Sequence, residues 1–481
     1  MKAKSEAIWG LLRGRRIVVR RSGFTSEMRV GSNSRYAGIP PRPVEAPLIT
    51  TYPGPGIQVH VISGRGSFWQ RAVGAWHENS ADQNDTTVRP RHGNYYEMRF
   101  LLVKTAPEEH VYSQFSNNLQ TALQQVGHQA NIAIQAIGDP TGLARELMSS
   151  KYDVVVSFSS VFGDAAIAET GKSMFDFLGV KFVGWQLDHP VYVHHALSQR
   201  MDNRRSIYPS HHHVRFSDAV KVRGKSLCLL PGGQALDEPP KAYKARQHDV
   251  FVAATWNGPP ERVWEDLGDS PAKRLFSAIV DHLMADRAGS VLDAFNNAIR
   301  QLKMNVRLGE DPKFDEEIIK LLRGPLTYLR NSDRLNAIQQ IVDAELPITI
   351  CGSGWRDYLG DRKNVTFLET RVPFKDMLSV YSDSRIVLNL NAANGGCERA
   401  IYGMAARASV VSEESGILAE SFTAGEDIAF FNRARPMDIV DVVGSLLESG
   451  RGESIAQSGH DRAMQTALWR HQAEKLIKFV D

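Results

Sequence analysis

The chain has 481 residues, of which 42% are hydrophobic and 23% are charged, and its formal net charge at pH 7 is +3. This length exceeds what one compact core usually organises and predicts two domains of ordinary size. The weak positive charge gives no reason to expect a nucleic-acid partner.

The three cysteines, Cys228, Cys351 and Cys397, are far apart, odd in number and free of CxxC spacing. This pattern argues against a disulfide scaffold or a zinc site, and it makes the reducing cytoplasm the expected location. No apolar run approaches the roughly 18 residues that a membrane-spanning helix needs.

The first 94 residues differ in composition from the rest of the chain. Six prolines crowd residues 40–55, and residues 79–94 are mostly polar. We expect residues 1–94 to form an N-terminal extension that is partly irregular. Within it, the apolar residues 8–12 precede three arginines, which fits either a mobile basic tail or weak peripheral contact with an anionic membrane surface.

Regular alternation begins near residue 95. Residues 100–103 and 154–156 are short apolar runs of the kind found in strands buried on both faces, and between them apolar residues recur at helical spacing. Strands that alternate with helices pair in parallel through right-handed crossovers. Residues 95–235 are therefore predicted to form a doubly wound, Rossmann-like domain.

After a linker rich in proline and glycine, the alternation restarts and predicts a second Rossmann-like domain over residues 248–452. Residues 285–345 read as a helical insertion longer than a simple crossover, and residues 453–481 as further helix. The expected fold class is α/β, with two doubly wound domains whose ligand-binding edges face one cleft.

Glycines follow an expected strand of the second domain at Gly352-Ser353-Gly354. They either let the backbone approach a phosphate or ribose, or form a plain tight turn. Trp355 adjoins this loop, and its ring either stacks on a sugar or base or packs in the core.

A second candidate segment leads from Asn391 to a helix that opens near Glu398 and Arg399. The free amides and the dipole at a helix start favour a diphosphate, and the Arg399 guanidinium adds positive charge. The alternative is a surface arginine paired with a local acid. Glu413 and Glu414 follow the next strand as candidate ligands for ribose hydroxyls.

Asp188 and His189 follow an expected strand of the first domain, at the edge of the cleft. Either is a candidate general base for an acceptor hydroxyl, and histidine suits that role by its pKa. The alternative is a helix cap, with Asp188 placed before Pro190. The adjacent histidines 211–213 alternate in direction if extended, so we expect no metal site.

The pieces ITICGSGW, NVTFLETRVPFKDMLSVYSDSRIVLNLN, ERAIYGMAARASVVSEES and AGEDIAFF occur in this order over residues 348–431. Here the chain resembles the C-terminal domain of the CgeB-like (spore-protein-type) glycosyltransferases of the GT-B superfamily. The resemblance implies that residues 95–235 form the acceptor side, that residues 248–452 bind the donor and that Arg399 contacts a diphosphate. It also implies that the helix at 453–481 crosses back to the first domain. No DxD motif is present, so the transfer of sugar from a nucleotide-diphosphate donor is expected to need no metal ion.

One departure concerns the helix at Arg399. The related pattern reads R-x-F-E-A-x-A-x-G, but Tyr402 stands at the glutamate and Arg407 at the glycine. This weakens the case for a retaining, glutamate-assisted mechanism. A UDP-sugar is our first choice of donor, and the acceptor, whether glycan, lipid, protein or small molecule, stays open. The alternatives are a sugar-nucleotide epimerase and a catalytically degenerate binding or assembly protein.

Overall fold

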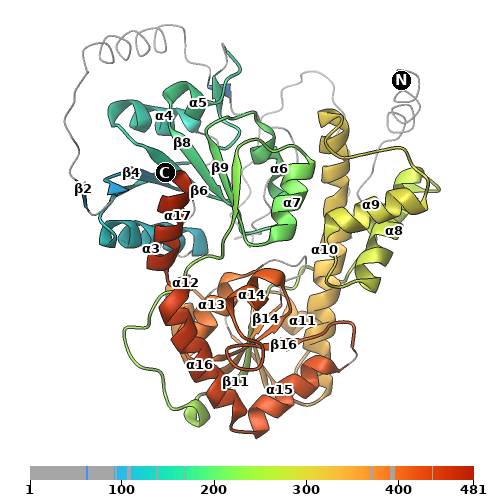
Figure 1. Ribbon diagram of the computed structural model, residues 1–481. Coiled ribbons are helices and arrows are strands. Elements are labelled where there is room, and N and C mark those ends of the chain that lie inside the picture. Colours follow the sequence, from blue (N-terminus) through green and yellow to red (C-terminus); the bar gives the residue numbers. More distant parts are fainter. Residues whose placement is uncertain are drawn as a thin grey trace, which may run out of the picture. The chain divides into compact units, whose positions relative to one another are not determined.

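The protein is described by a computed structural model with two parallel β-sheets flanked by helices (Figure 1). Most of the expected N-terminal extension, its membrane-contact segment and Asn391 lie outside the residues that the structure describes. Those residues are 61–62, 91–92, 95–105, 110–136, 139–167, 170–368, 372–390, 396–435 and 437–481.

The first sheet has the order β10-β9-β8-β6-β4-β5, with six strands in the described residues, and all neighbours are parallel. Strand order reverses between β4 and β6, as in a doubly wound fold. The strands are β4 (Arg99–Lys104), β5 (Gln129–Ile134), β6 (Val154–Phe158), β8 (Lys181–Trp185), β9 (Arg204–Tyr208) and β10 (Lys225–Cys228). The helices are α3 (Val111–Gln125), α4 (Pro140–Ser149), α5 (Met174–Leu178), α6 (Pro190–Ser198) and α7 (His211–Ala219).

Four short strands in the described residues lie outside this sheet and form two pairs. The pair β1 (Val61–Ile62) and β7 (Ala166–Ile167) is parallel, and β2 (Arg91–His92) pairs with β3 (Tyr95–Tyr96) in antiparallel fashion.

The second sheet has the order β13-β12-β11-β14-β15-β16, again with six parallel strands in the described residues. Its order reverses between β11 and β14. The strands are β11 (His248–Ala253), β12 (Ile348–Cys351), β13 (Val365–Phe367), β14 (Ser384–Asn389), β15 (Ser409–Glu413) and β16 (Ala429–Phe431). The helices are α8 (Pro271–Ala285), α9 (Val291–Gln301), α10 (Pro312–Asp343), α11 (Trp355–Leu359), α12 (Phe374–Ser382), α13 (Glu398–Ala405), α14 (Gly416–Ser421), α15 (Asp438–Glu448), α16 (Arg451–Thr466) and α17 (Trp469–Val480), with 3₁₀ turns η1 (Tyr243–Ala245) and η2 (Val263–Leu267).

These two sheets confirm the predicted α/β fold class of two doubly wound, Rossmann-like domains. Their central strands are buried because they are apolar on both faces, as in Val154–Phe158 and Ile348–Cys351. None of the helices in the described part of the chain combines the length and apolar character that a bilayer-spanning helix needs.

Helix α10 links the two domains. Asp311 starts it by accepting hydrogen bonds from the amides of Lys313 and Phe314, and Pro312 occupies the first helical position. Along its length α10 packs against α6 of the first domain and α15 of the second. The Arg323 side chain donates to the carbonyl oxygens of Val191 and Tyr192 at 3.2 and 3.1 Å, which fixes α10 to the start of α6.

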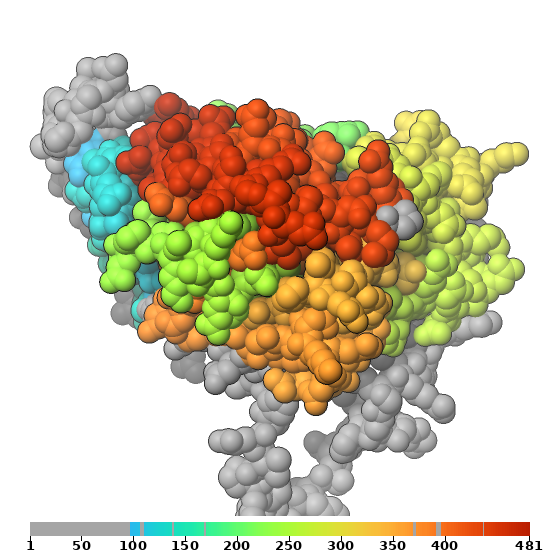
Figure 2. All heavy atoms as spheres, turned by 90° about the horizontal axis from the view of Figure 1, so that it is seen from below, coloured from blue at the N-terminus to red at the C-terminus, as the bar shows by residue number. Residues whose placement is uncertain are grey.

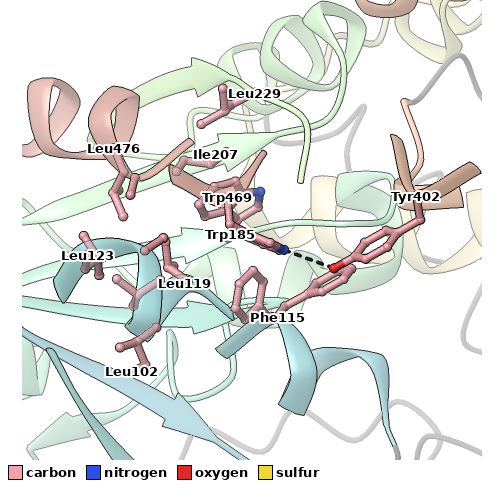
Figure 3. Packing of buried hydrophobic residues seen from close by; sticks show 14 of the residues in the cluster. Leu102, Phe115, Leu119, Leu123, Trp185, Ile207, Leu229, Tyr402, Trp469 and Leu476 are labelled. Carbon is pink, nitrogen blue, oxygen red and sulfur yellow. Dashed lines mark hydrogen bonds between the residues drawn. The ribbon is translucent and has the colours of Figure 1, made fainter. Parts of the chain in front are cut away.

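Helix α17 returns to the first domain and packs beside α3 (Figure 1). Figure 3 shows the aromatic cluster that it completes, in which the Trp469 ring lies 5.2 Å from Phe115 and 5.7 Å from Trp185 between centroids. Tyr402 of α13 stacks on Phe115, and its hydroxyl accepts a hydrogen bond from Trp469 Nε1 at 3.1 Å. The cluster therefore fixes the position of α13 relative to the first sheet.

The segment that follows β10 runs along the second domain. Figure 2 shows it in lime green beside the red C-terminal helices. The Tyr243 hydroxyl lies 2.8 Å from Ser409 Oγ, and Arg246 Nη1 donates to the carbonyl oxygens of Ser384 and Arg407 at 2.9 and 2.6 Å. These bonds hold the linker against β14, β15 and the end of α13.

Candidate functional site

The strand order reverses between β11 and β14, and doubly wound domains bind ligands beyond the carboxyl ends of the strands at such a switch point. We call this region the crevice. The Arg399 guanidinium lies at this point, because its Nη1 donates to the carbonyl oxygen of Ala253 at 2.8 Å, at the end of β11. Helix α13 begins one residue earlier, so its first-turn amides lie beside the same crevice.

Two further arginines come from α10. Arg330 and Arg334 are four residues apart and therefore share one face of the helix. Burial and repulsion from the Arg399 and Arg330 guanidiniums lower the pKa of Arg334 to about 10. Arg334 thus stays positive at neutral pH beside two other cations.

The positive charge of these three arginines is not neutralised by ion pairs. Among the described residues, none of the three has an acidic side chain within 4 Å. The Nε atoms of Arg330, Arg334 and Arg399 are all buried without a hydrogen-bond partner. Guanidinium groups without an acidic partner suit an anionic ligand.

Asp188 follows β8 and faces this arginine group. The side chain of Asp188 is exposed to solvent, but protein atoms surround its carboxyl group on most sides. Burial raises the pKa of Asp188, with Glu398 adding to the increase and Arg330 opposing it. A carboxylate with a raised pKa is a better general base near neutral pH. The structure therefore brings together Asp188, Glu398 and Arg399, three residues singled out in the sequence.

His189 lies elsewhere. Its ring is buried 4.6 Å from the His213 ring and 4.9 Å from that of Phe216, and burial holds its pKa well below the usual range. His189 Nδ1 accepts the Val191 amide at 3.2 Å, so His189 is the cap of α6. The alternative interpretation from the sequence, in which Asp188 caps this helix, is wrong. Asp188 is left free to face the crevice, and His189 is closed off from it.

The Gly352-Ser353-Gly354 loop reaches the same edge of the sheet through β12. Gly352 has a φ of 150°, and a Cβ there would overlap the carbonyl oxygen of Ala254 after β11. Glycine is required at position 352 because the loops that follow β11 and β12 approach too closely to leave room for a side chain. Trp355 is fully buried and donates its indole N–H to Ala254 O at 2.8 Å, so its ring belongs to the core. Ser353 is exposed at this edge.

Glu413 ends β15 inside a buried charge network. Its carboxylate lies 3.2 Å from Arg433 Nη2, and Arg433 also pairs with Asp333, which accepts from Arg287 at 2.8 Å. Neither Glu413 oxygen makes a well-aligned hydrogen bond within the described residues. Burial raises the pKa of Glu413 to about 8, with Arg433 opposing the shift. Glu414, in contrast, is exposed.

The two departures from the family pattern have structural explanations. Tyr402 is fully buried, and its hydroxyl oxygen accepts hydrogen bonds from Trp469 Nε1 at 3.1 Å and from Asn118 Nδ2 at 3.2 Å. Its side chain therefore packs between the domains instead of entering the crevice. Arg407 has a φ of 57°, the left-handed conformation that glycine adopts at low cost, and it lies two residues after the end of α13 at Ala405.

Sequence reasoning missed Arg330 and Arg334. Their spacing on one helix face was visible, but nothing local indicated which surface that face would cover. The three histidines at 211–213 lie on α7, where His211 Nε2 is 3.0 Å from Glu420 Oε2. Among the described residues, no group of three or more His, Cys, Asp or Glu side chains has an arrangement that would hold a metal ion.

Comparison with known proteins bears on the second domain. Residues 330–478 match the family described as Glycosyl transferase-like. The matched segment contains all three arginines of the crevice as well as Glu398 and Glu413. No curated protein matches the chain.

Solved structures with a similar chain course are distant in sequence. AviGT4, a glycosyltransferase involved in avilamycin A biosynthesis, is 11% identical over 80% of this chain and 97% of its own, with a TM-score of 0.43. Alr3699/HepE from Anabaena, in complex with UDP-glucose, is 11% identical over 79% and 100%, with a TM-score of 0.45. Sucrose-phosphate synthase from Thermosynechococcus elongatus is 11% identical over 79% and 98%, with a TM-score of 0.43.

Proposed function

We propose that this protein transfers a sugar from a nucleotide-diphosphate sugar to a hydroxyl-bearing acceptor, in the manner of the CgeB-like proteins that it resembles. The observation that carries the proposal is the group of three arginines without acidic partners at the switch point of the glycosyl transferase-like domain. Uridine is the first base to test because it is the commonest in such enzymes.

In this proposal the diphosphate lies between Arg399 on α13 and Arg330 and Arg334 on α10. Negative charge grows on the diphosphate as its bond to the sugar breaks, so cations already fixed there stabilise the transition state. Three guanidiniums and the start of α13 supply this positive charge from the protein, and no step requires a metal ion.

The other residues that are expected to contact the donor differ in how exposed their side chains are. Ser353 and Glu414 are exposed at the strand ends and are proposed to contact the nucleoside. Gly352, Gly354 and Trp355 are proposed to shape that wall. Glu413 and Glu398 are proposed to act near the ribose and diphosphate, and Asn391 belongs to the same proposed site.

Asp188 is proposed as the general base of an inverting displacement. Its carboxylate takes the proton of the acceptor hydroxyl while that oxygen attacks the anomeric carbon and the diphosphate leaves. The raised pKa of Asp188 favours this step at neutral pH. His189 would serve the reaction only through its cap on α6, which positions the preceding loop.

The donor site is tested by calorimetric titration of the protein with UDP, GDP, CDP and dTDP, with EDTA present. We expect one nucleotide to bind, and Arg399→Ala and Arg334→Ala each to weaken it by about 10- to 100-fold, as loss of a hydrogen bond to a charged group does. Arg145→Ala, an exposed position on α4, is the control and should bind normally. Equal binding by all variants, or a requirement for a divalent ion, would contradict this site.

The base is tested separately with Asp188→Asn. This variant should bind the nucleotide at least as well as the parent, because a negative charge near the diphosphate is removed. Release of free sugar from the donor nucleotide sugar should fall by roughly 10²- to 10⁴-fold. Unchanged turnover would remove Asp188 from the chemistry while leaving the donor site intact.

A further inference from the structure

A cavity of about 650 Å³ is lined by residues other than those of the arginine crevice. It is bounded by the edge strand β10 of the first sheet, by α14 of the second domain, and by α16 and α17. Its volume falls within the roughly 300–1,000 Å³ typical of small-molecule pockets. None of its lining residues belongs to the proposed donor site.

One side of this cavity is apolar. Leu229 and Leu230 from the end of β10 meet Ile417 and Phe422 around α14, and all four are buried. Phe479 of α17 extends the wall and is half-buried. A hydrocarbon chain placed along these side chains would leave water for an apolar environment, which is favourable in proportion to its length.

The cavity is also lined by three cations. Arg462 of α16 and Lys475 and Lys478 of α17 line the cavity with their side chains exposed. In the described part of the chain, no acidic side chain lies within 4 Å of either lysine or of Arg462. Glu420 also lines the cavity, but its carboxylate is paired with His211 at 3.0 Å.

The lining therefore combines an apolar wall with three cations, so an occupant that suits it carries both a hydrocarbon chain and an anionic head group. An alkyl phosphate monoester has both parts. Its phosphate oxygens can accept hydrogen bonds from the two lysines.

We propose that this cavity binds one single-chain phosphate monoester, with its hydrocarbon chain along Leu229, Ile417 and Phe479 and its phosphate between Lys475 and Lys478. The occupant would touch the edge of the first sheet as well as α14 and α16, so it would bridge elements of both domains. This site is separate from the donor crevice and does not depend on the proposed reaction.

The test uses dodecyl phosphate below its critical micelle concentration, measured by isothermal titration calorimetry with the full chain. We expect one molecule to bind per chain. Lys475→Gln and Lys478→Gln should each weaken binding at least fivefold, and the double variant at least tenfold. Arg470→Gln removes a positive charge from the same helix outside the cavity and should bind like the parent. UDP binding should be unchanged in all of them, which separates this test from that of the donor site.

Two comparison ligands and a space-filling variant complete the design. Inorganic phosphate lacks the chain and dodecyl maltoside lacks the charge, so both should bind at least tenfold more weakly than dodecyl phosphate. Thr466→Phe places a ring in the cavity and should block binding. The proposal is overturned by absence of dodecyl phosphate binding, by equal loss in Arg470→Gln, or by equal affinity for phosphate or the maltoside.

Discussion

The hydrogen bond between Trp469 Nε1 and the Tyr402 hydroxyl offers a direct test of how α17 is fixed to α13. The two atoms are 3.1 Å apart, and Trp469 and Tyr402 are 4% and 0% exposed. Tyr402→Phe keeps the ring stacked on Phe115 and leaves the buried Trp469 N–H without an acceptor. An orphaned buried donor costs about 1–3 kcal/mol. Asn118, also bonded to this hydroxyl, is half-exposed and keeps Gln234 as a partner, so we expect a loss of about 1–2 kcal/mol.

Urea unfolding followed by circular dichroism measures this loss as a change in the free energy of unfolding. The control is Tyr358→Phe, the same chemical change at a side chain that is 45% exposed, where we expect a change within about 0.5 kcal/mol. Trp469→Phe should cost less in the Tyr402→Phe background than in the parent, because the bond is already lost. If Tyr402→Phe is as stable as the control, the bond does not hold the two helices together.

Three further predictions concern single positions. Arg407→Gly should raise the free energy of unfolding, measured in a thermal melt, by up to ~1 kcal/mol. The reason is that the strain of an arginine in the left-handed conformation exceeds the entropy that glycine loses on folding. A lower stability would argue against strain at this position. Gly352→Ala should lower the free energy of unfolding by about 1–3 kcal/mol, because the added Cβ would overlap Ala254 O. Gly450→Ala is the control and should be near neutral, because a Cβ there meets open space. Equal effects of the two substitutions would refute the close approach at Gly352. Burial raises the Glu413 pKa from 4.5 to about 8, so the contribution of Glu413 to stability is full below pH 4.5 and is lost as pH rises to about 8. Glu413→Gln should therefore lose less stability than the parent over that window, and parallel pH profiles would contradict the shift.

Local patterns in the sequence were enough to predict both domains. A strand such as Val154–Phe158 is apolar on both faces, and this composition by itself indicates a central strand of a parallel sheet. The start of α13 at Glu398 could be predicted because it follows a strand and a glycine pair. The position of Arg399 at the switch point followed from that chain order, since the carboxyl ends of neighbouring parallel strands share one edge.

What only the tertiary structure decided is which distant segments meet at that edge. Arg330 and Arg334 lie about 65 residues before Arg399 in the chain, and they reach the crevice because α10 is anchored on α6 through Arg323. The choice between Asp188 and His189 depended on which side chain turned inward to cap α6. Tyr402 could not be understood before α17 was seen to return to the first domain, because its hydrogen-bond partner is Trp469. Periodicity reports only the environment along one element, whereas these positions depend on the packing of elements far apart in sequence.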